Sequence, residues 1–255
     1  MNVASAVLIT MFGAAVGSFL NVCIYRLPLR KSLVWPGSHC PSCDAPVKPY
    51  DNVPIAGYLW LGGRCRNCRA RISIQYPIIE LVTALVFLGG YLLFDSPLLL
   101  VQRLLFACAM IVLFVIDLEH RILPDVITLP GIVIGFVFSL FLPPGWRDSL
   151  IGIVVGGGSL WLMGELYFRV RHEEGMGFGD VKMLAMIGGF LGWKLMLLTL
   201  VLSSFLGSII GVGVIVLNRG DMKYALPFGT FLAVGAIVAA AVGESIVTWY
   251  TGFYY

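Results

Sequence analysis

Charged residues are scarce in this sequence. Lys, Arg, Asp and Glu together make up 12% of the 255 residues, about half of the roughly 25% found in a soluble globular domain. Apolar residues make up 59% of the chain, and the mean hydropathy is +0.93. This composition argues against an ordinary soluble protein and predicts a membrane protein.

Three sequence patterns are also missing. No strand is followed by a glycine-rich loop and a helix, the unit with which soluble domains bind nucleotides. The first segment has neither a basic start nor a small-residue cleavage site, so we expect a retained first span rather than a cleaved signal peptide. Inverted repeats, which would favour a secondary transporter, are absent at the level of motifs. The triplet Gly156-Gly157-Gly158 lies inside an apolar stretch, where we expect it to allow close helix packing.

What the sequence does contain is a series of long apolar stretches. Four are free of charge and approach the roughly 20 residues that cross a bilayer as a helix. Three more carry one interior charge each, and an eighth has only eleven uncharged residues, so its helix must include polar neighbours to cross. We therefore predict an all-α polytopic membrane protein with about eight transmembrane helices. The stretches are residues 2–25, 126–146, 195–218 and 224–243, then 72–94, 96–116 and 149–168, then 183–193.

The positions of Lys and Arg predict the orientation. With eight crossings and the N-terminus outside, fourteen of the seventeen basic residues fall on the cytoplasmic side, and only Arg103, Arg147 and Lys194 fall outside. This distribution follows the positive-inside rule. Because the asymmetry accounts for most of the net charge of +3, we expect no nucleic-acid partner.

Two aspartates adjoin apolar stretches on the cytoplasmic side. Asp117 directly follows one such stretch, and Asp180 ends the motif Gly177-Phe178-Gly179-Asp180. A carboxylate at membrane depth is costly and marks function by default. Two that converge can share one proton and activate water for peptide hydrolysis. We interpret Asp117 and Asp180 as the catalytic pair of an aspartyl protease working at or inside a membrane.

Simpler interpretations stand beside this one. Asp180 would serve equally as the N-cap of the next helix after a flexible glycine loop. The residues 119–121 that follow Asp117 fit an ordinary solvated helix end, and Asp125, after a proline, is expected to cap the next span. Two other classes of protein also use such features. A proton-coupled transporter relays protons through intramembrane aspartates, and a membrane redox protein would use pairs of cysteines.

The segment 26–76 is the only loop large enough for a separate module. It contains the pairs Cys40/Cys43 and Cys65/Cys68, with 21 residues between them. At this spacing four thiolates hold Zn²⁺ tetrahedrally, as in a zinc ribbon. Disulfides are disfavoured in the cytoplasm, and the βαβ context of a thioredoxin-like motif is missing. We predict a structural zinc, since four protein ligands leave no open position for water and so small a module needs a metal for stability.

Several motifs together resemble the type 4 prepilin peptidases nearly from end to end. Thr230, which follows the last of them, stands where a proline is common in that family. The motifs are GSFLNV at 17–22, YRLP at 25–28, HCPSC at 39–43, YDNVP at 50–54, GRCRNC at 63–68, YPIIEL at 76–81, the segment 117–125, GMGFGDVK at 175–182 and PFG at 227–229.

The resemblance implies a bifunctional enzyme of type IV pilus and type II secretion systems. Such an enzyme cuts the basic leader from prepilins and pseudopilins after a glycine, at the cytoplasmic membrane face. It then N-methylates the new N-terminal residue with S-adenosylmethionine. By resemblance, Asp117 and Asp180 are the catalytic residues. The partners are the prepilin substrates and membrane lipid, and the location is the bacterial inner membrane with the zinc loop and the active site on the cytoplasmic side.

The resemblance also implies a division of the chain. Residues 1–25 form the first transmembrane helix, residues 26–76 form a zinc-binding loop associated with methyl transfer, and residues 77–255 form the peptidase domain. The residues of the methyl-donor site stay unassigned, with Asp51 and Glu80 as candidate contributors. A chain from a peptidase-only branch of the family would lack this second activity. Glu119, Glu173 and Glu174 either are ordinary solvated residues or attract the basic leader of the substrate.

Overall fold

A computed structural model of the chain describes residues 2–172, 177–218 and 227–252. The described part is helical, with two isolated β-bridges and no longer strand. The chain divides into two compact units, residues 1–104 and residues 105–255. The fold class predicted from composition and apolar stretches is confirmed.

Six helices in the described ranges are long and apolar enough to cross a membrane. One further apolar helix, α5, is shorter, with 15 residues. The six are α1 (Val3–Arg26), α3 (Gln75–Leu93), α4 (Pro97–His120), α6 (Trp146–Arg171), α7 (Phe178–Asn218) and α8 (Phe228–Thr251), and α5 runs over Asp125–Ser139. All eight predicted apolar stretches lie in or overlap these seven helices, because α7 contains two of them. The protein is therefore a multi-pass membrane protein.

Helix α7 is two helical arms joined at Gly192. Its 41 residues would extend for about 60 Å as one straight helix, twice the thickness of the hydrocarbon core. Gly192 interrupts the helix with φ 76° and ψ 171°, a conformation that side-chain-bearing residues avoid. A Cβ at this position would also lie 2.7 Å from Cβ of Pro144. The break separates the short stretch 183–193 from the long stretch 195–218.

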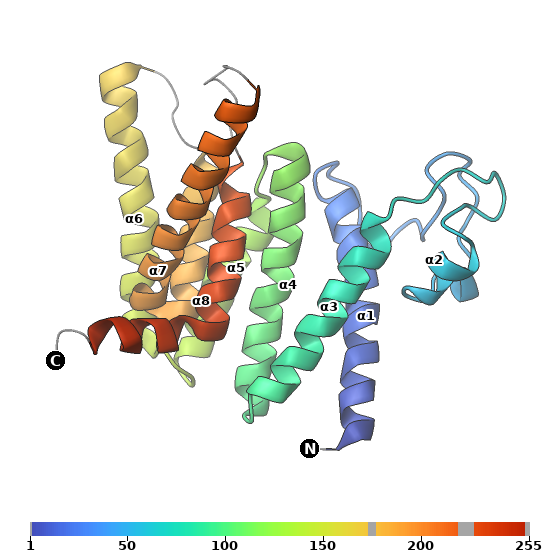
Figure 1. Ribbon diagram of the computed structural model, residues 1–255, viewed down its shortest axis with the longest axis horizontal. Coiled ribbons are helices and arrows are strands. Elements are labelled where there is room, and N and C mark those ends of the chain that lie inside the picture. Colours follow the sequence, from blue (N-terminus) through green and yellow to red (C-terminus); the bar gives the residue numbers. More distant parts are fainter. Residues whose placement is uncertain (1, 173–176, 219–226, 253–255) are drawn as a thin grey trace. The chain divides into compact units, whose positions relative to one another are not determined.

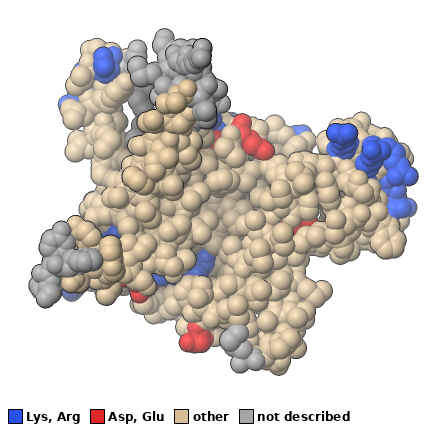
Figure 2. All heavy atoms as spheres, in the orientation of Figure 1, with Lys and Arg blue, Asp and Glu red and all other residues tan. Residues whose placement is uncertain are grey.

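In the first unit, α1 packs against α3 along a glycine face (Figure 1). A Cβ at Gly17 would lie 2.7 Å from Cα of Glu80, so only glycine permits this approach of the two helices. The segment between α1 and α3 contains η1 (Pro49–Asp51) and α2 (Ala56–Trp60). Figure 2 shows Lys and Arg side chains gathered over this segment.

Two polar side chains of the helices, Glu80 and Arg26, hold that segment, and a third, Asn21, joins the two helices to each other. The buried carboxylate of Glu80 accepts a hydrogen bond from the Ile55 N–H at 2.7 Å. The Asn21 side chain donates to the Tyr76 carbonyl at 3.1 Å. The buried guanidinium of Arg26 donates to the carbonyls of Ser32, Pro36 and Gly37. Because buried polar groups need partners, these contacts set where the loop leaves and rejoins the helices.

In the second unit, the first arm of α7 lies at the centre of the core. Helix α7 as a whole packs against α5, α6 and α8, and Figure 1 shows α6, α7 and α8 side by side. The short stretch 183–193, the least certain of the predicted spans, supplies four side chains with 0% exposure. These are Met183, Leu184, Met186 and Ile187.

Glycines in the neighbouring helices make room for this arm. A Cβ at Gly156 of α6 would lie 2.9 Å from the Leu184 carbonyl oxygen, and one at Gly135 of α5 would lie 2.7 Å from the Phe190 ring. The predicted close packing at the 156–158 triplet is confirmed for Gly156, whereas Gly158 faces open space. Small residues at helix contacts are the usual way to bring membrane helices together.

Large apolar side chains also cover the outer face of the second unit. Helix α6 alone exposes six of them over more than half of their surface, a surface suited to hydrocarbon and unfavourable in water. They are Val154, Trp161, Leu162, Met163, Leu166 and Val170.

Candidate functional site

Asp117 lies in the last turn of α4 and is 5% exposed. Its Oδ2 atom accepts two hydrogen bonds from one residue, Thr230: one from the backbone N–H at 2.7 Å and one from the hydroxyl at 3.0 Å. Thr230 is the third residue of α8, after Pro227 at the N-cap position. Since N–H groups in the first turn of a helix have no partner within it, this N–H is available to Asp117.

Asp180 lies in the first turn of α7, and its N–H donates to the Gly177 carbonyl at 3.1 Å. It is the third residue of the helix rather than its N-cap, so its carboxylate is not used to cap α7. The side chain is partly buried. Of the glycine motif around it, Gly175 lies outside the described residues, as do Glu173 and Glu174.

Leu123 joins the segments that present the two aspartates. A Cβ at Gly179, next to Asp180, would lie 2.9 Å from Cβ of Leu123. A Cβ at Gly229, next to Thr230, would lie 3.0 Å from Cδ1 of Leu123 and 3.0 Å from Oδ2 of Asp117. The ends of α4, α7 and α8 therefore meet around one leucine, and glycine is required where α8 passes the Asp117 carboxylate.

The structure brings Asp117 and Asp180 together within the second unit. The two carboxylates are close enough for their charges to interact, and the guanidinium of Arg121 also acts on Asp117. Like charges at short range cannot both ionise freely, so such a pair shares a proton near neutral pH. A pair of this kind can take a proton from water and give one to a carbonyl oxygen.

Asp125 does not cap α5 as the sequence suggested. The helix begins at Asp125 itself, with Pro124 at the N-cap position and no side-chain capping bond. The Asp125 carboxylate instead pairs with Nζ of Lys182 at 2.6 Å. The physical reason is the start of the helix: an N-cap precedes the first helical residue, whereas Asp125 is that residue. The contact joins the start of α5 to the first turn of α7.

The four predicted metal-ligating cysteines also lie together, in the first unit. The Sγ atoms of Cys40, Cys43, Cys65 and Cys68 are all within 4.8 Å of one another. Those of Cys40 and Cys68 are 3.8 Å apart, and thiolates bound about 2.3 Å from a tetrahedral zinc are separated by about the same distance. All six cysteines of the chain fall in the described part, and none forms a disulfide.

The two cysteine loops have the same backbone hydrogen bonds. In each, the N–H of the first cysteine donates to the carbonyl five residues later, and the N–H four residues later donates back to that cysteine's carbonyl. The residue after each second cysteine has a positive φ, 54° and 60° respectively. The bonded pairs are Cys40 with Ala45 and Asp44, then Cys65 with Ala70 and Arg69.

Backbone N–H groups around the cluster favour thiolates. The N–H groups of Cys68 and Asn67 lower the pKa of the Cys65 thiol to about 6. The Ala45 N–H likewise lowers the pKa of Cys43. The Ala70 N–H acts in the same direction on Cys68, but its thiol neighbours outweigh this effect and raise its pKa to about 11. A metal must displace the protons that remain, and this donor set of four sulfurs suits Zn²⁺.

Arg66, between the two cysteines of the second loop, holds η1 against the cluster. Its Nε donates to Oδ2 of Asp51 at 2.8 Å and its terminal nitrogen donates to Oδ1 at 2.6 Å. The hydrogen bonds from Arg66 lower the pKa of the Asp51 carboxyl. Both candidate contributors to a methyl-donor site, Asp51 and Glu80, thus already have protein partners.

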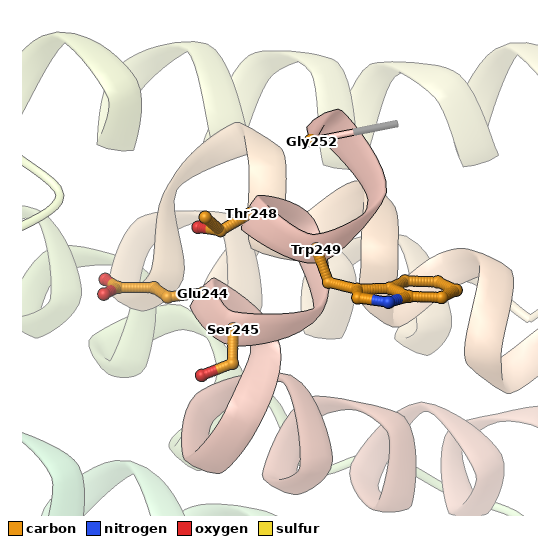
Figure 3. A pocket seen from close by; sticks show the side chains of 5 residues that line it. All are labelled: Glu244, Ser245, Thr248, Trp249 and Gly252. Atoms are coloured by element: carbon orange, nitrogen blue, oxygen red, sulfur yellow. The ribbon is translucent and has the colours of Figure 1, made fainter. Parts of the chain in front are cut away.

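A hollow of about 580 Å³ lies elsewhere, along the last turns of α8 (Figure 3). In Figure 3, Trp249 points away from Glu244 and Thr248. One helix end supplies the whole lining, so no opposed groups converge there, and Thr230 lies at the other end of α8. The lining residues are Glu244, Ser245, Thr248, Trp249 and Gly252.

Comparison with known proteins gives matches along most of the chain. Residues 11–94 match the Bacterial Peptidase A24 N-terminal domain, and residues 104–212 match the Type IV leader peptidase family. Curated relatives carry the name prepilin leader peptidase/N-methyltransferase. Those of Aeromonas salmonicida (strain A449) and Pseudomonas aeruginosa (strain PAO1) are each 36% identical, over 95% of this chain and 92% of the relative. That of Legionella pneumophila is 34% identical over 96% and 93%. No solved structure matches.

Proposed function

This chain belongs to the type IV leader peptidase family, and on that premise we propose that it matures type IV prepilins and pseudopilins. It cleaves the basic leader after a glycine and then N-methylates the new N-terminal residue. The observation that supports this most directly is the meeting of Asp117 and Asp180 at the ends of three apolar helices. The curated relatives, named for the same two activities, support both halves.

The aspartate pair performs the hydrolysis. One carboxylate is ionised and takes a proton from a water molecule held between the two, and the resulting hydroxide attacks the scissile carbonyl. The other carboxyl is protonated and donates to the carbonyl oxygen as negative charge develops there. When the C–N bond breaks, the proton taken from water passes to the leaving amine. The pair thereby returns to its starting state with one shared proton.

Both membrane and cytoplasm take part in substrate binding. The chain lies in the bacterial inner membrane with its N-terminus outside, which puts Asp117 and Asp180 near the cytoplasmic face. The distribution of Lys and Arg supports this orientation. The apolar helix of the prepilin stays in lipid against the helices of the enzyme, and its basic leader stays at the surface. Acidic Glu119, whose side chain is 42% exposed, lies on this side.

Zinc is the metal that the cysteine cluster fits, with Cys40, Cys43, Cys65 and Cys68 as ligands. The sulfur separations and the lowered pKa values of two of the thiols support it. Four protein ligands leave no position for water, so the ion stabilises the segment 26–76 and takes no part in peptide hydrolysis. The division into a first helix at 1–25, this loop at 26–76 and a peptidase domain at 77–255 follows from these roles.

S-adenosylmethionine supplies the methyl group when bound. The amine exposed by cleavage, once it has lost its proton, is the acceptor. Asp51 accepts from Arg66 and Glu80 accepts from Ile55, so we assign neither carboxylate to the methyl donor.

One experiment tests both activities. Purified protein in detergent or lipid is given a prepilin and labelled S-adenosylmethionine, and mass spectrometry follows the N-terminus of the product. Wild type should yield a chain cut after glycine with one added methyl, whereas Asp117→Asn and Asp180→Asn should each slow cleavage by roughly a thousandfold or more. Cleavage by either variant at the wild-type rate would show that the pair is wrongly assigned.

The same experiment separates the rival functions. Cleavage without methylation would leave a peptidase whose zinc loop has another purpose. No cleavage of any of several prepilins by zinc-loaded wild type would favour a proton-coupled transporter. Stoichiometric zinc with no thiol–disulfide cycling would count against a membrane redox protein.

A further inference from the structure

The two aspartates have different surroundings. Asp117 accepts two hydrogen bonds on one oxygen, both from Thr230. Asp180 accepts no hydrogen bond on its carboxylate from any residue in the ranges that the structure describes. The only charged groups that act on Asp117 in these ranges are Asp180 and Arg121. Thr230 therefore makes the pair asymmetric.

The two hydrogen bonds favour the ionised form of Asp117. An ionised carboxylate only accepts hydrogen bonds, whereas a protonated one carries a hydrogen of its own. A proton on Oδ2 would point at two donors, so that oxygen must stay an acceptor. Donors of this kind stabilise the ionised carboxylate, and charge-assisted bonds are the stronger ones. The second oxygen, Oδ1, is the one left to accept a proton from water.

We propose that Thr230 holds Asp117 as the ionised member of the pair, so that Asp117 takes the proton from water and Asp180 carries the shared proton. This rests on the proposed function. Water gives one proton to Oδ1 of Asp117 as its oxygen bonds to the carbonyl carbon, and Asp180 gives its proton to the carbonyl oxygen. As the C–N bond breaks, Asp117 passes its proton to the leaving amine and Asp180 recovers the proton from the oxygen. Thr230 acts through Asp117 and is therefore a positioning residue.

The position of Thr230 in α8 makes the idea testable with single substitutions. As the third residue of the helix, it uses its N–H for Asp117 and not for the helix. A proline there removes both donors at a place where helices tolerate proline. Thr230→Val removes only the hydroxyl and keeps the shape, and Thr230→Ser keeps both donors. The three variants thus have zero, one and two of the hydrogen bonds.

The measurement is kcat/KM for cleavage of a prepilin peptide, with basic leader, glycine and apolar helix, against pH. Loss of a donor makes ionised Asp117 harder to form, so the acid limb should move to higher pH by about one unit per lost bond. On the acid limb, kcat/KM should fall roughly tenfold in Thr230→Val and further in Thr230→Pro. On the plateau, the change should stay under about threefold. Thr230→Ser should match wild type.

The limb that moves identifies the ionised aspartate. If Asp117 is ionised in the active form, losing its donors shifts the acid limb and leaves the basic limb in place, since Asp117 is charged on both sides of the second ionisation. If Asp117 instead holds the shared proton, the basic limb moves and the acid limb stays. Movement of the basic limb alone, or of neither limb, would overturn the proposal.

Two controls separate this test from folding and from the proposed function. Thr199→Val removes the hydroxyl of another buried threonine of the second unit, one that donates only to the Leu195 carbonyl. It should leave both limbs unchanged. If wild type and Thr199→Val cleave no prepilin peptide, the proposed function fails. If both cleave and the Thr230 variants show the wild-type profile, only the role of Thr230 fails. Recovery of the profile in Thr230→Ser shows that a shift in Thr230→Val is not due to misfolding.

Discussion

The cysteine cluster and the aspartate pair are assembled in opposite ways. Each cysteine loop closes on itself through two backbone hydrogen bonds. A metal held by all four sulfurs would be the main link between the loops, beside the Asn67 side chain, which donates to Sγ of Cys43. The aspartate pair needs no metal to link its parts, because the packing of the helices places Asp117, Leu123, Asp180 and Gly229 close together. The comparison teaches that the first site depends on its ligand for its shape, whereas the second depends on the core of the protein.

Metal removal should show this difference most strongly. Structural zinc contributes a large free energy to small modules, so chelation should abolish hydrogen-exchange protection at the N–H groups of Cys40 and Cys65, which donate within the loops. Protection at the Thr230 N–H, which donates to Asp117, should not change. Mass-spectrometric hydrogen exchange with and without a chelator measures both.

Cysteine variants give the matching control. Cys65→Ser should lose bound zinc, and Cys108→Ser, outside the cluster, should keep it. Loss of protection at Thr230 together with that at Cys65 would show that the two sites are not independent.

A smaller effect is expected from adding one methyl group beside Asp117. In Gly229→Ala the new Cβ would lie 3.0 Å from Oδ2 of Asp117 and from Cδ1 of Leu123, so one or both side chains must shift by a few tenths of an ångström. Misplacement of a reacting group by about 1 Å costs up to roughly a hundredfold, so we expect this smaller shift to lower kcat by about three- to tenfold. Gly158→Ala is the matched control, since its Cβ would meet open space. Zinc content should stay at the wild-type value in both, and equal kcat for the two variants would contradict the geometry described for α8.

The smallest effect is expected at the Asp51–Arg66 pair. Asp51→Asn removes a bidentate contact between a carboxylate that is 7% exposed and a guanidinium that is half-exposed. Because solvent reaches the guanidinium and screens the pair, its contribution is small, and zinc release to a chromogenic chelator should speed up by about two- to fivefold. Because the pKa of Asp51 is lowered from its ordinary value of about 3.9, its contribution is present above that value and is lost only as pH falls through the lowered pKa.

The ratio of release rates should therefore be constant between pH 6 and 8 and should shrink in high salt. Arg66→Gln should behave in the same way, and the double variant should be no faster than either single one. A ratio that changes steadily across this pH range would mean that another group is responsible.

The sequence predicted the features that depend on residues close to one another in the chain. The Cys-x-x-Cys pairs identified all four members of the cluster, because each loop is local and only two loops had to meet. The apolar stretches predicted the helices for the same reason. This includes the short stretch 183–193, which lies in the core of the second unit. The catalytic roles of Asp117 and Asp180 remain proposals, although the structure places the two side chains together.

What the sequence could not predict depends on contacts between distant segments. Thr230 and Asp117 are 113 residues apart, and the only sign of their contact was an unexpected residue after Pro227-Phe228-Gly229. The cap predicted at Asp125 was wrong because α5 begins at Asp125 itself, and the carboxylate pairs with Lys182, 57 residues later. Gly192 breaks α7 where Pro144 approaches it, and no local signal distinguishes that glycine from the others in the helix.

The matching hydrogen bonds of the two cysteine loops have a consequence for how the chain can vary. Main-chain atoms alone close each loop, so the side chains between the cysteines are free to make contacts elsewhere. In the second loop, Arg66 pairs with Asp51, and the Asn67 side chain donates to Sγ of Cys43 in the first loop. A substitution at either position should therefore change what the second loop contacts without opening the loop itself.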